Sequence, residues 1–117
     1  MVTGFKNVVI FVKDLDAAKS FYRDRLRLPL AAESVAMMEF FPGAPTTLGV
    51  SLAMTDDAIR LVGRHTGITL TVSGLRNLCD ELSAAGVQFA EPFVSTPWGT
   101  MAVVMDPDGN QIALVEQ

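Results

Sequence analysis

The chain has 117 residues, of which 50% are hydrophobic and 19% charged, a size and composition typical of one domain whose core needs no disulfide or metal. Thirteen acidic and nine basic residues give a net charge of -4, which lacks the basic surface expected of a nucleic-acid-binding protein. The single cysteine, Cys79, excludes an internal disulfide and indicates a reducing, cytoplasmic location, and no apolar run approaches the ~18 residues of a membrane span.

The first predicted element is a strand over residues 7–12. Its apolar residues alternate, so neighbouring side chains point to opposite sides of a sheet. One side carries Val8, Ile10 and Val12, and the other carries Asn7, Val9 and Phe11. The run lacks the basic lead and the cleavage site of a signal peptide, which favours a strand.

A helix is predicted next, with Asp14 as its N-cap and Pro29 shortly after its end. Its apolar residues recur at helical spacing and are Leu15, Ala18, Tyr22 and Leu26. Residues 30–41 and 47–54 are strand-like, with Pro42-Gly43 as a breaker between them. The first 54 residues therefore predict the order β-α-β-β-β. Residues 55–66, rich in charged side chains, are interpreted as a solvated connection.

A shift of the sequence by 60 residues lays the second half over the first, which predicts two copies of one unit. Residues 67–72 repeat the opening strand, and Ser73 is the expected N-cap of a helix that Gly86 ends. The apolar stripe of that helix is Leu75, Leu78, Cys79 and Leu82. Strands over 87–94, 99–106 and 110–116 complete the copy, with a turn at 106–110 between the last two.

Three motifs resemble the vicinal oxygen chelate superfamily, which includes glyoxalase I, extradiol dioxygenases, fosfomycin resistance enzymes and bleomycin resistance proteins. They are Val12-Lys-Asp-Leu-Asp-Ala-Ala-Lys-Ser-Phe-Tyr22, Pro97-Trp-Gly99 and Asp106-Pro-Asp-Gly-Asn-Gln-Ile112. The resemblance implies an α+β fold in which two tandem βαβββ modules form a cup-shaped mixed sheet. A single domain is expected over 1–117, with module one at 1–54, a linker at 55–66 and module two at 67–117.

Enzymes of this superfamily hold a divalent metal at four strand positions, commonly with His and Glu. Those positions in this sequence are Asn7, Ser51, Gly67 and Ala113. None of the four is an imidazole, carboxylate or thiolate, which are the groups that bind such ions. The chain is therefore expected to bind neither metal nor another cofactor, like the bleomycin-resistance-like members that lack metal.

Three further residues bear on that expectation. His65 precedes Gly67 by two residues and lies on the same strand face, but a displacement of about 6–7 Å would need a bulge to reach the cup. Glu39 alternates so that it can enter the cup, as a base or a ligand-orienting group, or can face solvent at an edge. Glu116 lies at an odd offset from Ala113, so it is expected on the opposite face as a solvated terminal carboxylate.

A metal-free cup keeps a mixed apolar and polar lining suited to an organic small molecule. The expected ligand-binding residues are Asn7, Val9, Phe11, Glu39, Ser51, Thr69, Thr71 and Trp98. By resemblance, Trp98 stacks on a flat ligand group, with packing at a dimer seam or loop base as the alternative.

The leading hypothesis is a cytoplasmic, homodimeric, non-catalytic protein that binds an aromatic or polycyclic ligand, as in drug sequestration. It has no nucleic-acid or membrane partner. One alternative is a lyase, isomerase or dioxygenase-like enzyme of the same superfamily with an atypical site, in which Glu39 is the candidate base. The other is a dimerising accessory domain that binds no ligand.

Overall fold

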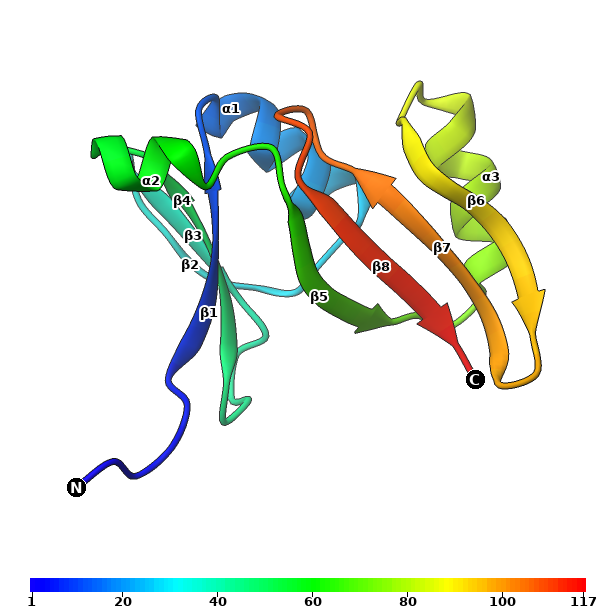
Figure 1. The fold of residues 1–117 in the computed structure, drawn as a ribbon, viewed down its shortest axis with the longest axis horizontal. Coiled ribbons are helices and arrows are strands. Elements are labelled where there is room, and N and C mark those ends of the chain that lie inside the picture. The colour runs from blue at the N-terminus through cyan, green and yellow to red at the C-terminus, as the bar shows by residue number, and fades with distance from the viewer. The chain divides into compact units, whose positions relative to one another are not determined.

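A computed structural model describes all 117 residues, which form two compact units, Met1–Val62 and Gly63–Gln117. Each unit contains one four-stranded mixed sheet with its own helices (Figure 1). The element order confirms the α+β class and the two tandem βαβββ modules expected from the sequence. None of the helices has the length and apolar character needed to cross a membrane.

Unit 1 (Met1–Val62) has the strand order β1-β4-β3-β2, in which β1 pairs with β4 in parallel and the other pairs are antiparallel. Its elements are β1 (Asn7–Val12), α1 (Leu15–Ala18), the π-helix η1 (Lys19–Arg25), β2 (Leu30–Glu33), β3 (Met37–Phe40), β4 (Thr47–Leu52) and α2 (Asp56–Arg60). The strand-like segment 30–41 thus contains both β2 and β3, which gives the expected order β-α-β-β-β.

The helix of unit 1 begins as predicted, because Asp14 Oδ1 accepts a hydrogen bond from the amide of Ala17 at 3.0 Å. It continues from α1 into η1, and the amide of Leu28 closes its end by donating to the Tyr22 carbonyl at 3.1 Å. Tyr22 is fully buried, and its ring lies 6.4 Å from that of Phe40 on β3. The helix thus covers one face of the sheet and forms the core there.

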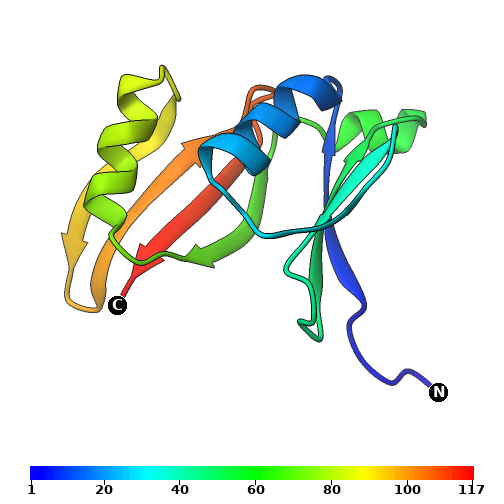
Figure 2. The same ribbon diagram turned by 180° about the vertical axis from the view of Figure 1, so that it is seen from behind.

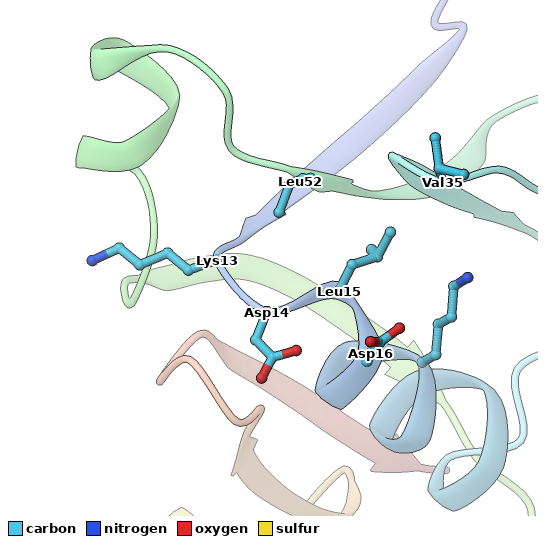
Figure 3. Close-up of a pocket in the computed structure, with 7 residues that line it drawn as sticks. Lys13, Asp14, Leu15, Asp16, Val35 and Leu52 are labelled. Carbon is cyan, nitrogen blue, oxygen red and sulfur yellow. The ribbon is translucent and has the colours of Figure 1, made fainter.

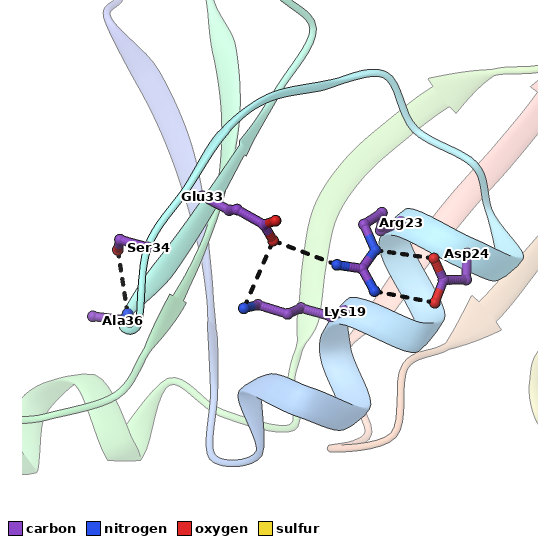
Figure 4. Close-up of polar contacts among 6 residues, drawn as sticks. All are labelled: Lys19, Arg23, Asp24, Glu33, Ser34 and Ala36. Carbon is purple, nitrogen blue, oxygen red and sulfur yellow. Dashed lines mark hydrogen bonds and ion pairs between the residues drawn. The ribbon is translucent and has the colours of Figure 1, made fainter.

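Charged side chains connect η1 to the outer strand β2. Glu33 Oε2 lies 3.6 Å from Lys19 Nζ and 3.5 Å from Arg23 Nη1, and Arg23 also pairs with Asp24 (Figure 4). The turn that follows β2 is closed by Ser34 Oγ, which accepts from the Ala36 amide at 3.2 Å. These pairs are partly exposed, so each stabilises the fold only slightly.

The segment 55–66 is more ordered than the predicted connection. Thr55 Oγ1 accepts from the Ala58 amide at 3.1 Å and caps α2. The first strand of unit 2 already begins at His65 rather than at Gly67. The linker predicted from charge alone therefore holds a short helix and the start of a strand.

Unit 2 (Gly63–Gln117) repeats the topology with the strand order β5-β8-β7-β6. Its elements are β5 (His65–Thr71), α3 (Leu75–Ala84), β6 (Phe89–Thr96), β7 (Gly99–Met105) and β8 (Gln111–Glu116). Helix α3 packs on β7 and β8, which Figure 2 shows from the helix side. The outer strand β6 contains Pro92, and its pairing with β7 has two register shifts.

The cap of α3 differs from the prediction. Gly74, with φ 75°, is the N-cap residue and Ser73 is not. Glu116 supplies the missing acceptors, since its Oε2 and Oε1 accept from the amides of Gly74 and Leu75 at 2.7 and 3.0 Å. These bonds lower the pKa of Glu116 below its ordinary value. Glu116 does lie on the opposite face from Ala113, but as a helix cap rather than a solvated terminal group.

The C-terminal end of α3 is as predicted. Gly86 adopts φ 84° and its amide donates to the Ser83 carbonyl at 3.0 Å, while the Val87 amide donates to the Leu82 carbonyl at 3.0 Å. This pair of bonds is the Schellman motif, which requires a left-handed residue at the position of Gly86. Cys79 is buried in this helix, and burial, with a smaller effect of Asp80, raises the pKa of its thiol. A thiol held protonated in this way is a poor nucleophile.

The turn 106–110 ties the last hairpin to the start of the unit. Asp106 Oδ1 accepts from the amides of Asp108 and Asn110, both at 2.9 Å, and its Oδ2 accepts from Asn110 Nδ2 at 2.9 Å. The Asn110 side-chain oxygen in turn accepts from the Gly63 amide at 2.9 Å. Both side chains are buried, so the motif acts as a structural clamp.

Candidate functional site

The sheet face of unit 1 that is opposite the core carries most of the residues predicted to bind a ligand. Alternation along the strands is as predicted, with Ile10 and Val12 buried in the core and Asn7, Val9 and Phe11 on the other side. Ladder register extends this second face across β4 and β3. The unit-1 face therefore consists of Asn7, Val9, Phe11, Met37, Glu39, Thr47, Gly49 and Ser51.

A glycine lies at the centre of the unit-1 face. Gly49 of β4 is paired with Val9 on one side and with Glu39 on the other. Val9, Gly49 and Glu39 form one row across β1, β4 and β3. Because Gly49 has no side chain, none lies between the apolar side chain of Val9 and the carboxylate of Glu39. No hydrogen bond or ion pair engages that carboxylate, which is half-buried. The face thus offers an unpaired acidic group beside a narrow apolar strip.

The same register identifies the first-module position that corresponds to Ala113. Ala113 of β8 is opposite Thr69 of β5, and the repeat counterpart of Thr69 is Val9, which is opposite Gly49. Gly49, not Ser51, is therefore the ladder counterpart of Ala113, two residues before the position taken from the looser sequence alignment. Ser51 lies on the same face, opposite Phe11.

Positions 7 and 49 are close enough for their side chains to act together. A Cβ atom at position 49 would lie 4.0 Å from Asn7 Nδ2 and 3.4 Å from Val9 Cγ2. In metal-binding relatives of this fold, a His and a Glu are expected at such a pair of positions. The amide of Asn7 and the hydrogen of Gly49 do not supply the imidazole and carboxylate that a divalent transition-metal ion requires. The donor set does not fit the metal.

The corresponding face of unit 2 is defined by the register of β5, β8 and β7. Thr69 and Thr71 lie on it and are exposed, as the alternation predicted. Ala113 and Val103 continue the row that starts at Thr69. The unit-2 face consists of Thr69, Thr71, Met101, Val103, Ala113 and Val115. It combines hydroxyl groups on the edge strand with apolar side chains on the inner strands.

His65 belongs to β5 and is exposed, with Gln111 as its partner in the ladder. The pairing of β5 with β8 is irregular between His65 and Thr69, where Gly67 adopts φ 73°. The sequence indicates that His65 needs a bulge in this strand to reach the cup, and the strand contains one.

Trp98 lies in the turn between β6 and β7 and is 80% exposed. Thr96 forms the turn, because its Oγ1 accepts from the Trp98 amide at 3.2 Å and donates to the Gly99 carbonyl at 2.8 Å. Gly99 is required there, since a Cβ atom would overlap the carbonyl oxygen of Glu116. The Pro97-Trp-Gly99 motif therefore fixes a tight turn that displays the indole to solvent.

A shallow hollow of about 570 Å³ lies elsewhere on unit 1, at the start of α1 (Figure 3). Its lining is Lys13, Asp14, Leu15, Asp16, Lys19, Val35 and Leu52. Two of these groups already have partners, since Asp14 caps α1 and Lys19 pairs with Glu33. The Lys13 side chain extends away from Leu52 and Val35 (Figure 3). We therefore place the candidate site on the sheet faces rather than here.

Sequence reasoning missed the contribution of Gly49, because a residue without a side chain leaves no signal of its own. Only its place could have been inferred, because the apolar neighbours Leu48 and Val50 show which face of the sheet position 49 occupies. Throughout the chain, no group of three or more His, Cys, Asp or Glu side chains is arranged to hold a metal ion.

Comparison with known proteins agrees with this fold. The family model of the Glyoxalase/Bleomycin resistance protein/Dioxygenase superfamily matches residues 4–114. No curated protein matches the chain.

Several solved structures superpose over nearly the full length. A Glyoxalase/bleomycin resistance protein/dioxygenase superfamily member from Sphaerobacter thermophilus is 27% identical, with 99% of this chain and 98% of that chain covered and a TM-score of 0.78. An antibiotic binding protein from Streptomyces sp. CB03234 is 28% identical, with 98% and 96% covered and a TM-score of 0.76. A lactoylglutathione lyase from Agrobacterium tumefaciens, 17% identical with 98% and 94% covered and a TM-score of 0.70, shares the fold.

Proposed function

Because the chain belongs to the Glyoxalase/Bleomycin resistance protein/Dioxygenase superfamily, we propose that it is a non-catalytic protein that binds a flat organic molecule without a metal. The ligand is an aromatic or polycyclic compound, and each sheet face offers residues that could bind it. On unit 1 the binding residues are Asn7, Val9, Phe11, Glu39 and Ser51, and on unit 2 they are Thr69, Thr71 and Trp98.

The observation that carries this proposal is the row Glu39, Gly49, Val9. Gly49 is itself buried, but it places no side chain between a carboxylate and a β-branched side chain, so a planar ring can lie across the row without obstruction from position 49. The ring gains apolar contact with Val9, while Glu39 is placed to pair with a cationic or hydroxyl substituent. At the position where an enzyme of this superfamily needs a carboxylate for its metal, this chain has a glycine.

The Streptomyces antibiotic binding protein supports a binding role, because it shares 28% identity over nearly the whole length of both chains.

Trp98 supplies a second contact surface. An indole that is 80% exposed on a hydrogen-bonded turn offers a large flat face on which a flat ligand can stack. The same exposure suits a contact between two copies, and we propose that the protein acts as a homodimer in the cytoplasm, in keeping with its lone buried thiol.

The proposal is tested with proflavine, a flat tricyclic cation, by equilibrium dialysis against the intact protein. We expect binding that Gly49→Leu weakens at least tenfold, because the new side chain fills the row between Glu39 and Val9. Glu39→Gln should weaken binding about fivefold through loss of one charge pair. Asp80→Asn, the same charge change on exposed α3, is the matched control and should leave the affinity unchanged.

Two results would contradict the proposal. Equal proflavine affinity in the wild type and in Gly49→Leu would exclude the unit-1 face as the binding surface. Nickel, zinc, manganese or iron at close to one ion per chain, in protein purified without chelator, would exclude the metal-free site. Unchanged affinity in Trp98→Ala would remove Trp98 from the binding residues, and sedimentation equilibrium tests the dimer.

A further inference from the structure

The bulge in β5 changes which residue of unit 2 corresponds to Asn7. In unit 1, Asn7 is opposite Thr47 and Val9 is opposite Gly49, so one residue of each strand separates the two pairs. In unit 2, His65 is opposite Gln111 and Thr69 is opposite Ala113, so residues 66–68 of β5 lie opposite Ile112 alone. Two extra residues are accommodated, and His65 falls on the ladder position that Asn7 holds.

One ladder hydrogen bond in each unit shows this equivalence directly. At the start of the unit-1 ladder, the Thr47 amide donates to the carbonyl of Lys6, the residue before Asn7, at 3.3 Å. In unit 2, the Gln111 amide donates to the carbonyl of Arg64, the residue before His65, at 2.9 Å. Paired residues of parallel strands point to the same side, so His65 shares a face with Gln111, Ala113 and Thr69.

The bulge satisfies its own polar groups. Thr66 Oγ1 donates to the Gln111 carbonyl at 2.7 Å and accepts from the Ile68 amide at 3.1 Å. The amide of Gly67 donates to Nδ1 of His65 at 3.1 Å. Bulges of this kind re-aim a side chain, and they occur beside functional sites more often than elsewhere.

The bond from Gly67 also sets the chemistry of the imidazole. A nitrogen that accepts from an amide carries no proton, so the neutral ring bears its proton on Nε2. The exposed end of His65 is therefore a hydrogen-bond donor. A metal ion would need a lone pair at that atom, whereas a carbonyl or phenolic oxygen of an organic ligand needs the donor that is present.

We propose that His65 is a ligand-binding residue of the unit-2 face, where its Nε2–H donates to an oxygen acceptor on a flat ligand whose ring lies over Thr69 and Ala113. This assignment rests on the proposed function. It adds that the preferred ligands carry a carbonyl or phenolic oxygen at the ring edge.

Two tricyclic probes that differ by one carbonyl oxygen, 9-fluorenone and fluorene, test the assignment in the intact protein. We expect the wild type to prefer fluorenone about fivefold, as one hydrogen bond implies. His65→Ala should abolish this preference, because it weakens the binding of fluorenone more than that of fluorene, and His65→Gln, which keeps a donor, should retain part of it. Asn77→Ala, on the exposed side of α3, is the matched control.

The sole histidine provides a second readout, because every imidazole signal in a nitrogen-15 spectrum belongs to His65. The neutral ring should be the Nε2–H tautomer, and fluorenone should shift the Nε2 resonance more than fluorene does. Binding of both probes with the same preference in wild type and His65→Ala would overturn the assignment alone. Failure of both to bind the wild type would overturn it together with the proposed function. If low micromolar Zn²⁺ shifted the imidazole signals at one ion per chain, His65 would be a metal ligand and the proposed donor role would be wrong.

Discussion

Glu116, one residue from the end of the sequence, caps the helix that begins at Leu75 by accepting the amides of Gly74 and Leu75 on its two carboxylate oxygens. A single side chain on β8 thereby satisfies two of the amides that a helix N-terminus leaves unpaired. The bonds require the ionised carboxylate, which is why the pKa of Glu116 is lowered in the folded protein.

This cap predicts a pH-dependent contribution to stability. A carboxyl group whose folded pKa lies below its unfolded value stabilises the protein above the unfolded pKa and stops doing so as the pH falls through the folded one. At pH 7, Glu116→Gln should lower the Tm by a few degrees. The difference from wild type should shrink as the pH falls below the ordinary value of 4.5. Thermal melts from pH 7 to 3 measure this, with Glu91→Gln on exposed β6 as the control, and a difference that grows on acidification would contradict it.

Asn110 is predicted to be the most sensitive polar position of unit 2. It is 1% exposed, its oxygen accepts from the Gly63 amide, and its nitrogen donates to Asp106. Asn110→Ala removes both bonds, including the one to buried Asp106, and should cost about 2–4 kcal/mol of unfolding free energy in urea titrations. Asn77→Ala, on the exposed side of α3, should change it by less than about 0.5 kcal/mol. Similar losses in both variants would show that the clamp does not stabilise the hairpin.

Two glycines in strands are expected to respond oppositely to alanine. A Cβ atom at Gly49 meets Val9 Cγ2 at 3.4 Å, an ordinary contact, so Gly49→Ala should leave stability unchanged or raise it by up to about 1 kcal/mol. At Gly99 the Cβ atom would overlap the carbonyl of Glu116, and φ is 135°, so Gly99→Ala should cost more than about 3 kcal/mol. Chemical denaturation of the two variants side by side tests the pair, and a large loss in Gly49→Ala would mean that the row is tighter than described.

The bulge at Gly67 permits a purely backbone prediction. No atom lies within 4 Å of a Cβ atom at this position, yet φ is 73°, which a β-branched residue adopts only with strain. Gly67→Val should therefore destabilise unit 2 by about 1–3 kcal/mol. Gly67→Asn should cost less, because asparagine tolerates the left-handed region. Equal losses by urea unfolding would indicate that the effect is steric rather than conformational.

Much of the fold follows from patterns that act over short distances. The Asp14 cap and the end of α3 at Gly86 depend on residues within a few positions of each other, and both are confirmed. The 60-residue repeat is visible because each copy carries the same local pattern, and the element order confirms it. The Ser73 cap was wrong because a residue 42 positions away, Glu116, approaches the amide of Gly74 only in the folded sheet. Local spacing cannot reveal an acceptor delivered by another strand.

The equivalence of His65 and Asn7 was missed for a related reason. The alternation of Ile68, Leu70 and Val72 aligns perfectly with Val8, Ile10 and Val12, so the sequence shift of 60 residues hides the two extra residues before them. Only the strand ladder, with His65 opposite Gln111, shows where the bulge lies. Register describes which residues of two strands are paired, so the sequence of one strand alone does not determine it.

Pro92 has a consequence for how copies of this chain can meet. It lies in β6, the outermost strand of unit 2, which also carries two irregularities in its pairing with β7. Proline has no amide hydrogen, so this edge strand lacks the unbroken row of donors and acceptors with which another strand could pair. Uncontrolled sheet extension into fibres is therefore disfavoured along β6.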